Sequence, residues 1–98
     1  MKHFYRSHLE PADVLIAADK FFPGIGFTTT ATEARARSFS GGALGTMKLG
    51  VKSEAGHYTF VQVDTDQMGE SRMDRNVKKF FVALHRIEEP RHELEAAY

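Results

Sequence analysis

Two segments in the middle of the chain alternate between apolar and polar residues, and a short turn containing glycine separates them. Residues 44–53 and 57–65 carry this pattern on either side of Glu54-Ala55-Gly56. A period of two is typical of a strand with one buried face, and a short loop with glycine in the left-handed position joins two such strands into a hairpin. The chain is therefore constrained to place antiparallel strands at its centre.

This turn also predicts a register. It pairs Ser53 with His57, Val51 with Thr59, Leu49 with Val61, and Met47 with Val63, which makes one face almost purely apolar. On the other face it pairs Lys52 with Tyr58, Gly50 with Phe60, and Lys48 with Gln62. A slip of one residue would mix the two sets, so the turn and the pattern agree.

Two segments with helical spacing of apolar residues flank the strands. The first begins at Glu10-Pro11, because proline suits the first helical turn. It ends at Phe22-Pro23-Gly24, because the residue before a proline avoids the α conformation. The second spans residues 71–88, where Ser71 and Asp74 resemble a capping box. Its apolar stripe consists of Met73, Val77, Phe80, Phe81 and Leu84. We expect Asp74 and Lys78, one turn apart, on its outer side.

Residues 2–9, 26–31 and 35–40 also have the composition of strands, with turns at Glu33-Ala34 and Ser40–Ala43. The order β-α-β-β-β-β-α predicts an α+β fold in which two helices pack on one face of an antiparallel sheet. We expect a single compact domain over residues 1–98, with 91–98 as a short helical turn or a frayed tail.

Charge and cysteine content argue against several classes of protein. Lys and Arg together number 13, as do Asp and Glu, so the net charge lacks the basic excess of a dedicated nucleic-acid or membrane-surface protein. The absence of cysteine excludes disulfides, thiolate catalysis and cysteine-type zinc sites. The sequence shows no signal-peptide core and no apolar run of bilayer length, so we expect a cytoplasmic protein.

Three stretches carry a likeness to known folds. They are the helix start Glu10-Pro11-Ala12-Asp13-Val14-Leu15, the exit Phe22-Pro23-Gly24-Ile25-Gly26-Phe27, and the terminal helix with Val77-Lys78-Lys79-Phe80-Phe81. Together with the order of elements, they resemble one repeat of the TATA-binding-protein fold and a shortened member of the polyketide cyclase/START-like helix-grip superfamily. The resemblance implies a curved antiparallel sheet around a long C-terminal helix. It transfers no functional residue.

No recognisable catalytic, cofactor or metal motif is present in the sequence. The five histidines (His3, His8, His57, His85 and His92) lack a zinc-ligand spacing, so we expect them on the surface. Asp64, Asp66 and Glu33 occupy strand-end and turn positions that are ordinary for exposed carboxylates. We therefore expect no cofactor and no metal, and we favour a non-enzymatic role without deciding it.

The second face of the sheet is the candidate site. If Phe39 pairs with Leu44 across the Ser40–Ala43 loop, this face gathers cations and aromatic rings: Arg35, Arg37, Phe39, Lys48, Lys52, Tyr58, Phe60 and Gln62. Arg35 would then lie opposite Lys48, an arrangement that disfavours pairing. The face is either solvated, with lysine stems covering the rings, or it binds a partner.

Three functions stay open. The leading hypothesis is a binding or interaction domain that forms a homodimer through this face. The second is a small apolar-ligand-binding or cyclase-like protein, with a pocket between the last helix and the sheet lined by Met47, Leu49, Val61, Phe80 and Phe81. The third is weak nucleic-acid binding, in which the cations contact phosphates and the rings stack on bases.

Overall fold

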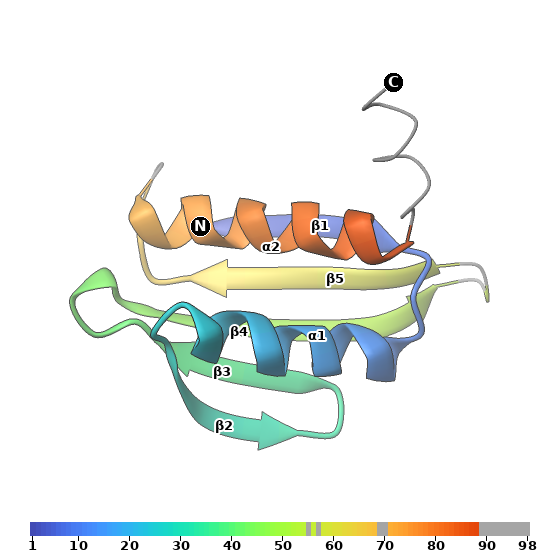
Figure 1. Cartoon of the computed structure of the whole chain (residues 1–98), viewed down its shortest axis with the longest axis horizontal. Helices are drawn as coiled ribbons and strands as arrows, with labels where there is room; N and C mark the ends of the chain where they lie inside the picture. The colour runs from blue at the N-terminus through green and yellow to red at the C-terminus, as the bar shows by residue number, and fades with distance from the viewer. Residues whose placement is uncertain (55, 57, 69–70, 89–98) are drawn as a thin grey trace.

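The computed structural model describes residues 1–54, 56, 58–68 and 71–88. Over these residues, five strands, two α-helices and a short 3-10 turn follow one another (Figure 1). Their bounds are β1 Lys2–Ser7, α1 Pro11–Gly24, β2 Thr28–Glu33, β3 Ala36–Ser40, η1 Gly42–Leu44, β4 Thr46–Glu54, β5 Tyr58–Thr65 and α2 Arg72–Glu88. The predicted α+β class and the order β-α-β-β-β-β-α are confirmed; the predicted tail, 91–98, lies outside the described residues.

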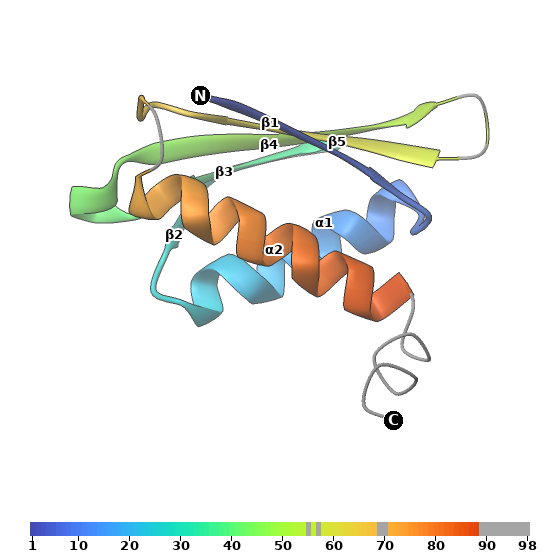
Figure 2. The same cartoon turned by 90° about the horizontal axis from the view of Figure 1, so that it is seen from above.

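The strands form one antiparallel sheet in the order β1-β5-β4-β3-β2. Both helices lie on the same side of it, and Figure 2 shows the sheet as one layer and the helices as a second. Among the described residues, no helix covers the opposite face of the sheet. Within the described part of the chain, neither helix is long and apolar enough to cross a membrane.

The central hairpin has the predicted faces but not the predicted register. Val51 pairs with Val61 and Leu49 with Val63, two residues away from the expected partners, and Glu54 with Tyr58 is the last pair before the turn. Because side chains alternate with a period of two, a shift of two residues keeps every side chain on its own face. The apolar pattern therefore could not distinguish the two registers. Gly56 has the expected left-handed conformation, with φ of 71°, whereas Ala55 and His57 lie outside the described residues.

The predicted register of β3 on β4 is wrong. Phe39 pairs with Met47 rather than Leu44, because the connection continues through η1 and Gly45, where φ is 105°. This shift of three residues is odd, so it moves Phe39 and Arg37 from the open face to the helix side. There Phe39 is fully buried with its ring 4.9 Å from that of Phe22, and Arg37 Nε donates to the Asp19 carboxylate at 3.0 and 3.2 Å. The observed register is favoured by the burial of the Phe39 ring and by the ion pair between Arg37 and Asp19 of α1.

Phe22 occupies the centre of the core between helices and sheet. It is fully buried, and its ring lies 5.0 Å from Phe80 of α2 and 5.6 Å from Phe27, in addition to Phe39. Around these rings pack apolar side chains from α1, β4, β5 and α2: Val14, Leu15, Ala18, Met47, Leu49, Val51, Val61, Val63, Met73, Val77 and Leu84. These side chains pack both helices against the sheet.

The start of α2 is a capping box, as predicted, but Asp74 does not point outward. Ser71 Oγ accepts a hydrogen bond from Asp74 N at 3.2 Å, and Asp74 Oδ2 accepts one from Ser71 N at 3.3 Å. Asp74 is nevertheless fully buried beside Met73, so the expected outer position beside Lys78 is wrong. The carboxylate is buried because residues of the sheet form hydrogen bonds with it, as described below.

Candidate functional site

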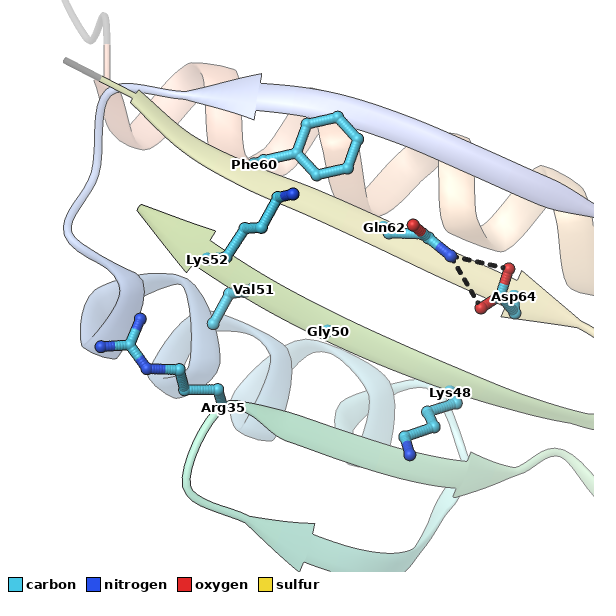
Figure 3. A pocket seen from close by; sticks show the side chains of 8 residues that line it. All are labelled: Arg35, Lys48, Gly50, Val51, Lys52, Phe60, Gln62 and Asp64. Atoms are coloured by element: carbon cyan, nitrogen blue, oxygen red, sulfur yellow. Dashed lines mark hydrogen bonds between the residues drawn. The ribbon is translucent and has the colours of Figure 1, made fainter. Parts of the chain in front are cut away.

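The open face of the sheet, opposite the helices, carries every second side chain of its strands. Aromatic and charged residues dominate it on β1, β5 and β4, and Figure 3 shows its centre. We define the open face by Lys2, Phe4 and Arg6 of β1, Tyr58, Phe60, Gln62 and Asp64 of β5, Lys48, Gly50, Lys52 and Glu54 of β4, and Glu33 at the end of β2; Arg35, in the turn that follows, borders it. It combines apolar rings with charges of both signs.

The aromatic part of the open face centres on Phe60. The ring of Phe4 lies 5.5 Å from the Phe60 ring, and 55% of Phe4 is exposed to solvent. The Arg6 guanidinium and the Lys52 ammonium each lie 5.5 Å from the Phe60 ring centre, within the range of cation–π attraction. Tyr58, also exposed, stands 5.4 Å from the ring of His8. The Phe60 ring is thus in contact with two cations and with the exposed ring of Phe4.

Beside this aromatic part lies a shallow groove of about 290 Å³. Its lining is drawn in Figure 3 and consists of Arg35, Lys48, Gly50, Val51, Lys52, Phe60, Gln62 and Asp64. Gly50 lies at its floor, between Lys48 and Lys52 on the same strand and opposite Gln62. The hollow exists because Gly50 has no side chain: a Cβ there would meet only the Arg35 carbonyl oxygen, at 4.0 Å.

Cations outnumber carboxylates around the groove. Its one carboxylate, Asp64, is held by Gln62 Nε2 at 3.0 and 3.2 Å and pairs in register with both Lys48 and Lys2. Lys48 also lies 3.5 Å from the Glu33 carboxylate. Arg35 and Lys52, by contrast, have no ion pair within the described part of the chain. The groove therefore carries positive charge that its own carboxylate does not neutralise.

The structure brings together most of the predicted face residues. Lys48, Lys52, Tyr58, Phe60 and Gln62 share the open face, and Arg35 lines its groove from the turn before β3. Arg35 does not pair with Lys48, which faces Ser38 instead, so the expected repulsion between directly opposed cations does not arise. Arg37 and Phe39 belong to the other side, as the β3 register requires.

Sequence reasoning missed the contribution of β1. Phe4 and Arg6 stand opposite Gln62 and Phe60, so the first strand supplies the most exposed ring of the face. The alternation of residues 2–9 places Phe4 and Arg6 on one side, which was a usable signal. The missing information was that β1 pairs with β5, the strand farthest from it along the chain.

The residues predicted to line an apolar pocket belong to the core. Leu49, Val61 and Phe80 are fully buried, and Met47 is 4% exposed. Phe81 is half-buried and stacks on Tyr5 with ring centres 5.2 Å apart. Their side chains pack α2 against the sheet.

Asp74 forms the most enclosed polar cluster. Its Oδ1 lies 2.7 Å from His3 Nε2 and accepts a hydrogen bond from Thr65 Oγ1 at 2.9 Å, while Oδ2 accepts one from Ser71 Oγ at 2.6 Å. Burial opposes ionisation, but these hydrogen bonds outweigh it and hold the pKa of Asp74 below its ordinary range. The cluster joins α2 to β1 and β5; the expectation that His3 lies on the surface is therefore wrong.

A second cluster joins the other end of α2 to β1. The Glu88 carboxylate accepts hydrogen bonds from Tyr5 Oη at 2.7 Å, from Ser7 Oγ and from the His8 backbone N–H. Burial disfavours its charge, but these donors prevail and lower the pKa of Glu88, while burial and the Glu88 carboxylate raise the pKa of Tyr5. The carboxylates of Asp74 and Glu88 thus both have a structural role. No group of three His, Asp or Glu side chains in the described ranges is placed to hold a metal ion.

Comparison with known proteins gives no match: neither a family model, nor a curated protein, nor a solved structure is significantly similar to this chain.

Proposed function

We propose that the protein is a non-enzymatic binding domain that associates with a second copy through the open face. The observation that carries this proposal is Phe4, which is 55% exposed beside the Phe60 ring on the side of the sheet that the helices leave uncovered. Aromatic residues of this kind supply most of the free energy at protein interfaces when they are buried by a partner.

The size of the open face is compatible with such an interface. Its strands are six, eight, nine, five and six residues long in spatial order. With a spacing of about 4.8 Å between strands and a rise of about 3.3 Å per residue, the face covers roughly 500–600 Å². Specific interfaces bury about 600–1,000 Å² on each partner, so stacking two open faces reaches the lower end of that range once side chains are included.

The charges of the open face suit a partner that presents the same surface. A symmetric dimer brings one patch against its own copy, so the patch must be self-complementary. Cations and carboxylates both occur on it, and Arg6 Nε already donates to Glu54 Oε1 at 3.1 Å within one copy. Both groups are partly exposed, so they can exchange this contact for an equivalent one across the interface.

Sedimentation equilibrium tests the proposal between about 10 μM and about 1 mM, the range of weak to moderate association. We expect the wild type to approach the dimer mass as concentration rises, and Phe4→Thr to remain a monomer, because threonine suits an exposed strand but removes the ring. Val82→Thr is the matched control, since Val82 is 52% exposed on α2 and lies on the helix side. A wild type that stays monomeric, or equal dimerisation by Phe4→Thr, contradicts the proposal.

A further inference from the structure

We propose that the groove over Gly50 is a binding site for a small anion that carries a flat apolar ring, such as an aryl phosphate or an aryl carboxylate. The groove is complete within one copy of the chain, and the dimer proposed above would cover it, so the ligand binds the monomer. Three features carry it: the missing side chain at the floor, the excess of cations around it, and the ring of Phe60 at its wall.

The floor of the groove is open because glycine stands where the strand would accept any residue. Gly50 lies in the middle of β4, paired on both sides, with no backbone conformation that requires glycine. A glycine in a strand interior weakens the strand and often marks a place where a ligand approaches the backbone closely. A flat ring can therefore lie on the bare backbone between Lys48 and Lys52.

The charges favour an anion over a neutral molecule. Arg35, Lys48 and Lys52 line the groove against the single carboxylate of Asp64, which accepts hydrogen bonds from Gln62. Lys48 also lies 3.5 Å from the Glu33 carboxylate, whereas Lys52 has no ion pair among the described residues. The Arg35 guanidinium points away from the Gly50 floor (Figure 3), so the Lys48 and Lys52 ammonium groups are the donors that can meet a phosphate or carboxylate there. An acidic group in the groove would thus complete contacts that the described residues leave open.

The wall and the volume of the groove limit the kind of apolar group that the ligand can carry. Phe60 lines the groove, and its ring offers contact to a flat partner. The volume of about 290 Å³ stands at the lower limit of the range of ligand sites, which restricts the ligand to a single small ring with its acidic group.

Titration followed by amide NMR shifts tests this assignment, with 4-nitrophenyl phosphate as the probe. We expect shifts at residues 35, 48–52 and 60–64. The affinity should be at least about tenfold higher than for inorganic phosphate, which lacks the ring, or for 4-nitrobenzyl alcohol, which lacks the acidic group. Equal binding of inorganic phosphate would show that only loose attraction to cations is present, and this overturns the inference. Shifts confined to other surfaces overturn it too.

Gly50→Val is the decisive variant, because its side chain fills the groove without touching the core. We expect it to fold and to lose at least about tenfold in affinity for the probe. Gly24→Val is the control, since Gly24 also has free space around it but lies at the end of α1. Lys52→Gln should weaken binding without filling the groove. Unaltered affinity in Gly50→Val refutes the site and leaves the dimer proposal standing.

Discussion

Removal of the Asp74 carboxylate should destabilise the fold more than any other change to a single charge described above. Asp74→Ala leaves His3, Thr65 and Ser71 without the acceptor that they share inside the protein. Breaking a buried charged cluster from one side costs about 3–5 kcal/mol. A chain of 98 residues has roughly 5–15 kcal/mol of stability, so the variant should lose a large share of it.

Urea denaturation measures this effect. With a slope of about 1.5 kcal/mol per molar urea, the midpoint should fall by about 2–3 M. Asp19→Ala is the matched control, because Asp19 makes its ion pair with Arg37 at the surface, where such pairs are worth at most about 1 kcal/mol. A loss in Asp74→Ala no larger than in the control would refute the reasoning that the buried cluster fastens α2 to the sheet.

The same residue predicts a dependence on pH with a definite sign. The pKa of Asp74 is lower in the folded protein than in the unfolded chain, where it is about 4. Its contribution to stability is therefore fully present above about pH 4 and is lost as the pH falls through the folded pKa. The difference in free energy of unfolding between wild type and Asp74→Ala should be constant near neutral pH and shrink progressively below about pH 4.

Three further changes test other parts of the structure. Phe22→Ala should lower the free energy of unfolding by about 3–5 kcal/mol, measured by urea denaturation, because it empties the centre of the ring cluster. Gly50→Val should raise the same free energy by about 0.5–1 kcal/mol, since valine suits a strand and has room there; a decrease would mean that the open face does not tolerate the side chain. Glu88→Gln should lower the pKa of Tyr5 toward its ordinary value, observed as phenolate absorbance at a lower pH; no change would show that Glu88 does not contribute.

The sequence predicted what depends on local patterns. Helix and strand positions, the apolar stripe of α2 and the two faces of the central hairpin all follow from spacing, and spacing is insensitive to a register shift of two residues. Spacing could not predict the register of β3 on β4, because the loop after Ser40 has three glycines and can close at several lengths. The observed register differs from the predicted one by an odd number of residues, so Arg37 and Phe39 both lie on the face opposite to the predicted one.

The clusters around Asp74 and Glu88 depend on distant partners. His3 lies 71 positions from Asp74, and Tyr5 lies 83 positions from Glu88, so neither pattern is visible locally. An acid three residues after the N-cap is ordinarily exposed, and only the neighbouring strands turn Asp74 into a buried group. The same pairing of β1 with β5 brought Phe4 to the open face, which is why the candidate site was only partly predictable.

The central claim, that the open face binds a second copy, is tested most directly by amide NMR spectra recorded over a dilution series. If the open face binds a second copy, the signals that move with concentration belong to β1, β5 and β4, with the largest changes near Phe4, Tyr58 and Phe60. Signals near Ile16 and Val82, on the exposed sides of the helices, stay constant. Spectra that do not depend on concentration, or changes centred on the helices, would contradict it.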